Sequence, residues 1–239
     1  MKLAVLTVKS TAGSMMRLAD VLLPAEREEL ASRLYQQALN VLGAVSLLDE
    51  LIVVSTDSAV LDAARLAGAR ILKEPNQLSH SHSAERGVEM ALRIAAHTVL
   101  SAPIDVPLAT STEYETLLET SSRLPTPSLI IVPSCDGMGT NALVRAPPDV
   151  IASRFGPGSF ERHRNAGIAA RAEVRVMCPP GITLDVDTPQ DLLTLGNQAT
   201  SNNDILDYLE RIDAFNRARR VRIGRDQASG TRHSPWIRS

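Results

Sequence analysis

Short apolar runs recur along this chain, each followed by a longer segment with helical spacing. The runs are too short for helices and are typical of strands buried on both faces. The expected strands are residues 3–8, 51–55, 69–72, 98–100, 128–132, 140–144 and 174–177, with a last short strand at 183–187.

The segments between these runs have the periodicity of amphipathic helices. After Pro24, apolar residues at 30, 34, 38 and 41 form one stripe, and three acidic residues stand near the start. Further helices are expected over residues 58–68, 84–96 and 112–122, and from residues 159, 189 and 201, the last reaching about Arg219. Residues 75–83 are polar and predict an irregular loop.

This alternation predicts an α/β fold with a mostly parallel sheet and helices on both faces. Ligands of such sheets bind beyond the carboxyl ends of the strands. Lys9, Asp105 and the loop before Ala84 follow three expected strands. We therefore expect them to border one cleft.

Composition narrows the class of protein. Of 239 residues, 44% are hydrophobic and 22% charged, which excludes a disordered or fibrous chain. No apolar run reaches the roughly 18 residues of a membrane span, and no cleavable leader is expected. Two distant cysteines favour a reducing cytoplasm. With only 3% aromatic residues, a base-stacking nucleic-acid platform is disfavoured.

Charge is unevenly distributed. Residues 1–210 carry a net charge of −8 and residues 211–239 a net charge of +6. The basic end would suit an acidic partner or nucleic acid, but a solvated helix end with a flexible tail is the favoured interpretation. We expect a main domain at 1–198 and a C-terminal helix with a basic tail at 199–239.

Three aspartates are the strongest candidates for chemistry. Asp185 and Asp187 are two apart, so in an extended segment their carboxylates share a face, roughly 7 Å apart. Asp105 lies between Pro103 and Pro107, which fix the backbone around it. The alternatives are a helix cap at Thr188 and a structural turn. Together the three favour magnesium and phosphoryl or nucleotidyl transfer.

Two glycine segments suggest anion binding. Residues 137–142 match a dinucleotide-binding fingerprint in form, but they lead into a strand rather than a helix, so that interpretation is rejected. A close approach to an anionic ligand or a plain hairpin turn remain. Gly156 to Ser159 opens a helix, where amides attract phosphate, although Ser159 alone would make an ordinary cap.

The histidines and Cys135 give weaker signals. His80 and His82 alternate in the polar loop, but they have no third ligand nearby, so a metal pair is disfavoured. His163 is expected to decorate the surface of its helix. No base stands near Cys135, so it is a poor candidate nucleophile.

An ordered set of motifs resembles a known family. Over roughly residues 3–195 the chain is similar to the 2-phospho-L-lactate guanylyltransferases of coenzyme F-420 biosynthesis, relatives of the molybdenum-cofactor nucleotidyltransferases. The motifs are Val8-Lys9, Arg17-Leu18, Pro24-Ala25-Glu26-Arg27, Val54-Ser55-Thr56-Asp57, Pro103-x-Asp105-x-Pro107, Asp136-Gly137-x-Gly139-Thr140-Asn141-Ala142-Leu143, Arg154-Phe155-Gly156-Pro157-Gly158-Ser159-Phe160 and Leu184-Asp185-Val186-Asp187-Thr188-Pro189-x-Asp191-Leu192.

The resemblance implies a Rossmann-like nucleotidyltransferase fold and a GTP-dependent enzyme. GMP would pass from GTP to the phosphate of 2-phospholactate, phosphoenolpyruvate or 3-phosphoglycerate, releasing pyrophosphate. Asp105, Asp185 and Asp187 match the catalytic, magnesium-holding aspartates. Thr140, Gly156 and Ser159 match the phospho-acid positions. Oligomeric state is left open, a homodimer being one option.

The nucleotide side departs from the family pattern. Met15 replaces a lysine and Ser79 replaces an asparagine. Lys9, Arg17 and Ser79 are the expected nucleotide-binding residues. Two alternatives stay open: a nucleotidyltransferase with another nucleotide or acceptor, and a degenerate nucleotide-binding scaffold. Three retained carboxylates favour an active enzyme.

Overall fold

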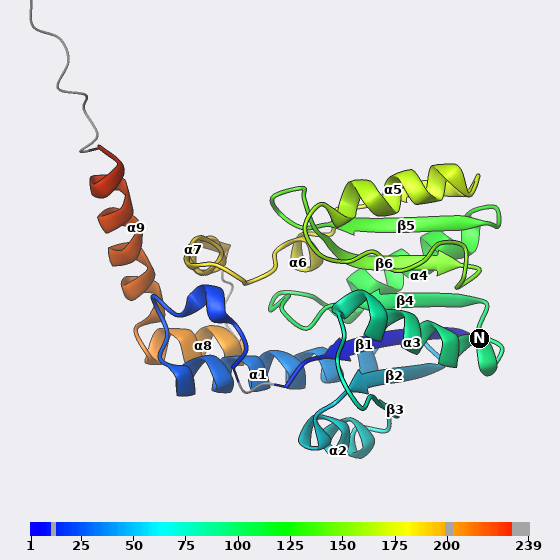
Figure 1. The fold of residues 1–239 in the computed structure, drawn as a ribbon, viewed down its shortest axis with the longest axis horizontal. Helices are drawn as coiled ribbons and strands as arrows, with labels where there is room; N and C mark the ends of the chain where they lie inside the picture. The colour runs from blue at the N-terminus through cyan, green and yellow to red at the C-terminus, as the bar shows by residue number, and fades with distance from the viewer. Residues whose placement is uncertain (11–12, 199–202, 231–239) are drawn as a thin grey trace, which may run out of the picture.

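A single mixed sheet organises the molecule. The computed structural model describes residues 1–10, 13–198 and 203–230, and within these residues seven strands follow the order β3-β2-β1-β4-β6-β5-β7 (Figure 1). The strands are β1 (Lys2–Val8), β2 (Glu50–Ser55), β3 (Arg70–Lys73), β4 (Thr98–Ala102), β5 (Ser128–Pro133), β6 (Thr140–Ala146) and β7 (Glu173–Val176).

Strand direction decides which ends meet. Neighbours pair in parallel except β6, which runs antiparallel to both β4 and β5. The amino end of β6, at Thr140, therefore lies at the same edge as the carboxyl ends of β1 and β4. This reversal places a glycine-rich turn beside the expected ligand edge.

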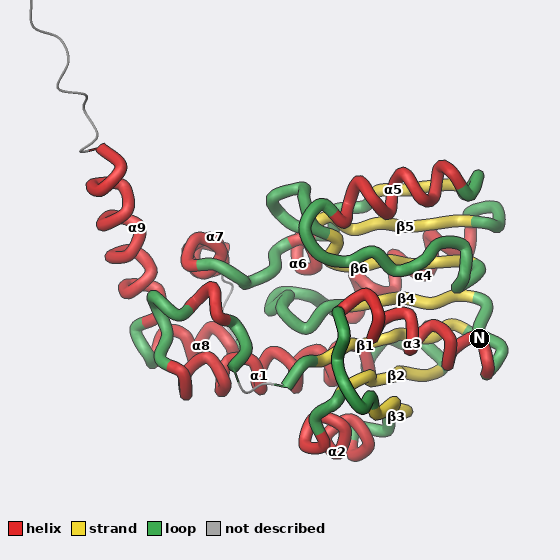
Figure 2. Tube along the Cα trace, in the orientation of Figure 1, coloured by secondary structure: helices red, strands yellow, loops and turns green. Residues whose placement is uncertain are grey.

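Helices cover both faces of the sheet, as the hydrophobic pattern predicts (Figure 2). Alternate residues of β1 face opposite ways: Ala4, Leu6 and Val8 pack with one set of helices, while Leu3 and Val5 pack with another. The first set is α1 (Pro24–Gly43), α2 (Ser58–Leu66) and α4 (Ser111–Arg123); α3 (His80–Arg93) and α5 (Ser159–Ala169) cover the other face. The predicted fold class is confirmed.

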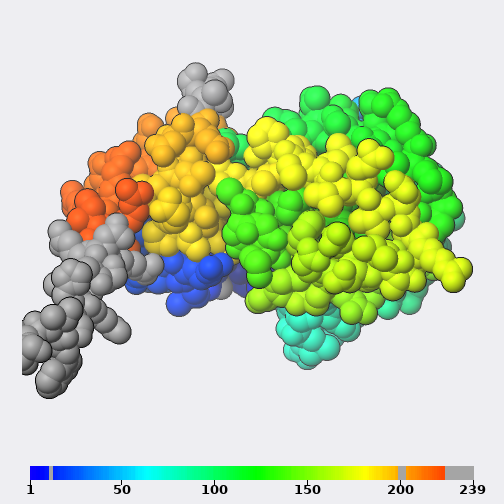
Figure 3. All heavy atoms as spheres, turned by 90° about the horizontal axis from the view of Figure 1, so that it is seen from above, coloured from blue at the N-terminus to red at the C-terminus, as the bar shows by residue number. Residues whose placement is uncertain are grey.

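The group of helices beside the sheet (Figures 1 and 3) encloses another hydrophobic cluster. We call it the helical cluster. Leu30 and Leu34 of α1 join it to the main domain, and Leu18 enters from the short 3-10 helix Met16–Leu18. The remaining elements are α7 (Pro189–Gln198), α8 (Asp204–Arg211) and α9 (Ala214–Gly230). None of the helices in the described ranges combines the length and apolarity needed to cross a membrane.

Three expected elements differ from the structure. The last strand, at 183–187, is wrong: α6 (Pro180–Thr183) ends there, and residues 184–187 are extended without a paired strand. The helix expected from residue 84 begins at His80, because the Ser79 side chain accepts a hydrogen bond from the His82 amide. The single helix expected from residue 201 is broken at Asp213, whose φ is 58°. Residues 231–239 lie outside the described ranges.

Candidate functional site

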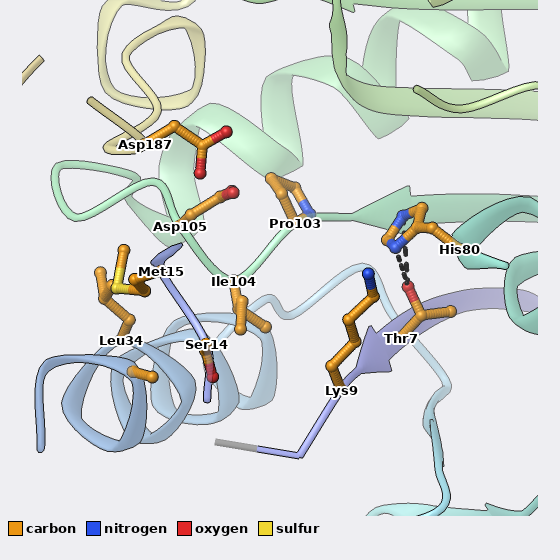
Figure 4. Close-up of a pocket in the computed structure, with 11 residues that line it drawn as sticks. Thr7, Lys9, Ser14, Met15, Leu34, His80, Pro103, Ile104, Asp105 and Asp187 are labelled. Atoms are coloured by element: carbon orange, nitrogen blue, oxygen red, sulfur yellow. Dashed lines mark hydrogen bonds between the residues drawn. The ribbon is translucent and has the colours of Figure 1, made fainter. Parts of the chain in front are cut away.

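Two cavities open at this edge of the sheet and share a wall. The first cavity, about 250 Å³, lies between the loop after β1 and the start of the loop after β4. The second cavity, about 500 Å³, lies between the β5–β6 turn and the loop before α5. His80, Pro103, Asp105 and Asp187 line both. Figure 4 shows the first cavity with these four residues around it.

Asp105 stands where the two cavities meet. Its backbone oxygen accepts a hydrogen bond of 2.8 Å from the Val186 amide, which fastens the extended segment 184–187 to the loop after β4. Loss of solvent and the charges of Asp187 and Asp185 raise its pKa to about 7. In Figure 4 the side chains of Asp105 and Asp187 lie next to each other.

Asp185 is oriented by a residue that sequence reasoning left without a role. The Asn141 amide, on β6, donates to the Ile182 and Thr183 oxygens at 2.9 and 3.0 Å and to Asp185 Oδ1 at 3.2 Å. Burial raises the pKa of Asp185, although this hydrogen bond opposes the shift. Asn141 thus holds residues 184–187, which we call the aspartate segment, against the sheet.

Asp187 points its carboxylate away from the helix that follows. Thr188 and Asp191 cap α7 through reciprocal hydrogen bonds, so the Asp187 carboxylate is not used as the cap. It accepts instead from Arg17 Nη1 at 3.2 Å, in a pair whose side chains are 70% and 41% exposed. Segment 184–187 keeps the expected alternation, with Leu184 and Val186 buried and the two aspartates partly exposed.

The expected three-carboxylate centre is only partly assembled. Asp105 and Asp187 line both cavities and Asp185 lines the second, so all three border one space. Within the described residues, however, no group of three or more histidine, cysteine, aspartate or glutamate side chains lies close enough to enclose an ion. Asp105 and Asp187 are the two carboxylates that share both cavities.

The loop before α5 and the first residue of that helix border the second cavity with both of their expected positions, Gly156 and Ser159. Gly156, with φ of 104°, and Gly158, with φ of 69°, adopt backbone conformations that favour glycine. Ser159 is buried yet lines the same cavity. The Arg162 guanidinium donates to the backbone oxygens of residues 154, 155 and 157 and so holds the loop in shape.

Thr140 also lines the second cavity, at the start of β6. Its Oγ1 lies 3.0 Å from Nδ1 of His163. The expectation that His163 decorates a helix surface is wrong, because its side chain is fully buried between the helix and the sheet. The Gly137 to Gly139 segment forms a tight turn, with φ of 72° at Gly137, and borders the cavity as well.

The expected nucleotide-binding residues are placed in three different ways. Lys9 lines the first cavity, beside Met15. Arg17 lines the second cavity instead, through its contact with Asp187. Ser79 caps α3 and borders neither cavity.

His80 is a site residue that sequence reasoning considered only as a disfavoured metal ligand. Both ring nitrogens lie within reach of Thr7 Oγ1, at 3.1 and 3.3 Å, and the ring meets Phe155 edge-on at 4.9 Å. Burial and the nearby Lys9 lower its pKa to about 4, so the ring is neutral. His80 therefore forms an uncharged wall between the cavities.

Comparison with known structures places the fold among nucleotidyltransferases. A protein of Desulfovibrio desulfuricans G20, assigned to the nucleotide-diphospho-sugar transferases, superposes with a TM-score of 0.74 at 18% identity, covering 92% of this chain and 97% of that one. A nucleotidyl transferase of Methanothermobacter thermautotrophicus gives a TM-score of 0.58 at 18% identity, with 82% and 95% covered.

Sequence relatives are more specific. The phosphoenolpyruvate guanylyltransferase of Rubrobacter xylanophilus is 35% identical over 192 residues, covering 80% of this chain and 92% of that protein. The 2-phospho-L-lactate guanylyltransferase of Methanothermobacter thermautotrophicus is 28% identical, covering 79% and 81%. The 3-phospho-D-glycerate guanylyltransferase of Colwellia psychrerythraea is 29% identical, covering 79% and 88%.

The family profile described as "Guanylyl transferase CofC like" matches residues 2–223, which include the whole sheet, both cavities and most of the helical cluster. The resemblance seen in the sequence motifs is thereby confirmed. The chain is a nucleotidyltransferase that belongs to the CofC-like guanylyl transferase family.

Proposed function

We propose that this guanylyltransferase moves GMP from GTP to the phosphate of a small phospho-acid in coenzyme F-420 biosynthesis. The observation that carries the proposal is the pair of cavities that meet at Asp105 and Asp187. With one cavity for each substrate, the reacting phosphates would meet at the shared wall. The relatives named for phosphoenolpyruvate, 2-phospho-L-lactate and 3-phosphoglycerate define the acceptor class.

GTP is assigned to the first cavity and the phospho-acid to the second. Lys9 gives the first cavity a cation at the end of β1, where this class of sheet receives phosphates. Thr140, Gly156 and Ser159 give the second cavity hydroxyl and backbone groups that can bind an anion. Arg17, paired with Asp187, stands between the acceptor side and the aspartates.

The aspartates suit a hard divalent cation. Burial first, and then the charges of Asp187 and Asp185, raise the pKa of Asp105 to about 7, so a cation at this position would be favourable. Carboxylate oxygens are the ligands that magnesium prefers. Asp105 and Asp187, which line both cavities, would hold the ion, with Asp185 beside them in the second cavity. When bound, the ion would supply positive charge to the phosphate oxygens.

The reaction needs positioning more than proton transfer. An oxygen of the acceptor phosphate, anionic at neutral pH, attacks the α-phosphorus of GTP, and the bond to pyrophosphate breaks. No general base is required, because the nucleophile carries no proton to remove. The chain's task is to hold two anions in line, which the two cavities on either side of Pro103 and Asp105 favour.

A pyrophosphate-release assay tests the proposal. GTP, CTP and ATP are each offered with phosphoenolpyruvate, 2-phospholactate and 3-phosphoglycerate. Turnover is expected with GTP and one or more of these acids. Turnover with CTP or ATP alone would identify a relative with another nucleotide, and nucleotide binding without turnover in any combination would identify a scaffold protein.

The aspartate assignment has its own test. Asp185→Asn and Asp187→Asn are expected to abolish turnover while the protein stays folded, since burial disfavours the charged form of Asp185 and an amide removes that cost. Thermal unfolding measures the fold, and calorimetric titration with magnesium in the presence of GTP measures the ion. Near-wild-type turnover of both variants would overturn the assignment.

A further inference from the structure

His163 contacts both sides of the second cavity, at Thr140 on β6 and at Arg154 in the loop before α5. Its ring is fully buried in α5, with one nitrogen facing the loop before that helix and the other facing β6. Nε2 lies 2.9 Å from the Arg154 backbone nitrogen, and Nδ1 lies 3.0 Å from Thr140 Oγ1. These two contacts together determine where the ring proton lies.

A backbone N–H can only donate a hydrogen bond. Nε2 of His163 must therefore accept from the Arg154 amide, and it carries no proton. The ring is also neutral, because burial and the charges of Arg145, Arg162 and Arg154 lower its pKa to about 3. A neutral imidazole has one N–H, so that proton is on Nδ1.

The Nδ1 proton fixes the role of Thr140. With Nδ1–H donating to Oγ1, the hydroxyl uses a lone pair on the histidine and keeps its own hydrogen. In the described part of the chain no other hydrogen bond of this hydroxyl is present, and Thr140 lines the second cavity. The opposite tautomer would let Thr140 donate to the ring and present only lone pairs to a ligand.

We propose that His163 is a positioning residue that makes Thr140 a hydrogen-bond donor to the bound phospho-acid. The group it receives is an anionic oxygen, phosphate or carboxylate, rather than a hydroxyl or ammonium group that must itself donate. The same ring ties Thr140 to Arg154 at the start of the Gly156–Ser159 loop, so both sides of the acceptor site are set by one side chain. The inference rests on the proposed function, which assigns the second cavity to the acceptor.

Matched substitutions separate the two contacts of the ring. The terminal amide of asparagine falls near the position of Nδ1 and can still donate to Thr140, whereas glutamine reaches toward Nε2 and leaves Thr140 without its donor. His163→Gln is expected to raise the KM for phosphoenolpyruvate at least about tenfold, with the KM for GTP unchanged, and His163→Asn to restore most of the loss. His97→Gln removes a similar histidine–threonine contact far from the cavities and serves as the control.

A double-variant cycle tests whether His163 acts through Thr140. Thr140→Val should raise the same KM, and adding His163→Gln should raise it little further, because the donor is already gone. Effects that multiply, or a parallel rise in the KM for GTP, would show that His163 merely supports the fold and would overturn the proposal.

Nitrogen NMR of histidine-labelled protein reads the tautomer without any substrate. The expected spectrum at neutral pH shows His163 as the neutral Nδ1–H form. A protonated Nε2 or an imidazolium would overturn the inference even if the enzyme turns over phosphoenolpyruvate. Conversely, the expected tautomer in a protein that uses no phospho-acid would refute the proposed function and leave the hydrogen-bond arrangement intact.

Discussion

Met15 lines the first cavity from a left-handed backbone position, with φ of 54°. Among the described residues that border this cavity, Lys9 is the single cation, since the neighbouring His80 is neutral. Arg17, which the sequence offers as a substitute, is turned toward Asp187 and the second cavity. The cavity proposed for GTP therefore carries less positive charge than the family pattern would give it.

Met15→Lys is expected to tighten GTP binding roughly tenfold, about 1.4 kcal/mol, because it adds a second cation to the first cavity. Calorimetry with magnesium present measures the Kd. Leu66→Lys adds the same charge at a position 91% exposed on α2, away from both cavities, and should leave the Kd unchanged. Equal Kd values for wild type and Met15→Lys would place the triphosphate elsewhere.

Residue spacing was enough to single out the aspartates, but not their supports. The two-residue spacing of Asp185 and Asp187, and the prolines that flank Asp105, were enough to identify them as candidates. Asn141 and His80 act on partners 41 and 73 residues away, and no local pattern reports such contacts. For His163 one sequence pattern was available. Ser159, His163 and Gly167 are spaced four residues apart, which places them on one face of a helix, and these three are the buried residues of α5.

At the scale of elements, α9 packs more closely than a basic C-terminal helix suggests. Ala214 and Ala218 are fully buried against the helical cluster, and Val221 packs beside them. Arg217 makes a two-pronged ion pair with Glu26 of α1, with nitrogen–oxygen distances of 2.8 and 2.9 Å. The start of α9 is thus part of the folded core, whatever its surface charge.

Truncated chains should show how much of α9 belongs to the folded core. A chain ending at Ile223 keeps Ala214, Ala218 and Val221 and is expected to retain wild-type activity and melting temperature. A chain ending at Ile212 removes them and uncovers α7, so its melting temperature should fall by several degrees. Scanning calorimetry of both chains decides the matter. A melting temperature unchanged by the shorter chain would mean that α9 adds nothing to the helical cluster.

Acid should loosen the contact between α1 and α9. The hydrogen bonds from Arg217 lower the pKa of Glu26 below its ordinary value of 4.5. A carboxylate whose pKa is lower in the folded state than in the unfolded state stabilises the fold at pH values above its unfolded-state pKa. That stabilisation is lost as the pH falls through its folded-state pKa. Urea unfolding of Arg217→Gln should show a loss of about 1 kcal/mol at pH 7 that shrinks below pH 4.5.

Arg220→Gln, at an exposed position of α9, provides the matched control and should cost little at either pH. A loss in Arg217→Gln that is the same at pH 7 and in acid would indicate lost packing of the arginine stem rather than a lost ion pair.

Element prediction failed where tertiary partners were missing. Residues 183–187 look like a strand because Leu184 and Val186 alternate with aspartates, and the burial does alternate. In the part of the chain that the structure describes, no strand pairs with them, and the segment hydrogen-bonds to the loop at Asp105 instead of forming a ladder. The start of α3 also differs from the expected one. The Ser79 side chain caps the helix inside a stretch whose polar residues predicted a loop.

Over the whole molecule, the aspartate segment connects two packed units. It leaves α6 at the edge of the sheet and enters α7 of the helical cluster, while α1 contributes side chains to both hydrophobic clusters. A ligand held by Asp105 and Asp187 therefore touches the sheet and the segment that leads to the cluster. Binding should stabilise the molecule as one unit.

GTP with magnesium, at 100 times its Kd, is expected to stabilise the fold by about 2.7 kcal/mol and raise the melting temperature by about 5–10 °C in a single transition. Fluorescence-monitored melting measures the shift. A chelator or Asp187→Asn should remove the part that depends on magnesium. Two separate transitions, only one of which moves, would show that the helical cluster unfolds independently of the site.

The α/β architecture was predictable because strand and helix periodicities differ along the chain. The helical cluster was not, since its buried leucines come from segments as distant as Leu18 and Leu209, each of which reads as an ordinary amphipathic helix or turn. The reversed direction of β6 likewise depends on which strands become its neighbours. Long-range pairing, rather than local preference, decides both features.

Most residues that line the second cavity lie in one stretch of the chain, from Ser134 to Ser159. His163, which contacts Thr140 in that wall, follows four residues later. The aspartates and Lys9 come from elsewhere. With the second cavity proposed for the acceptor, acceptor choice depends mostly on residues encoded by one contiguous stretch of the gene. Exchanging that stretch between relatives is expected to change the acid used, while the proposed nucleotide side stays with the parent chain.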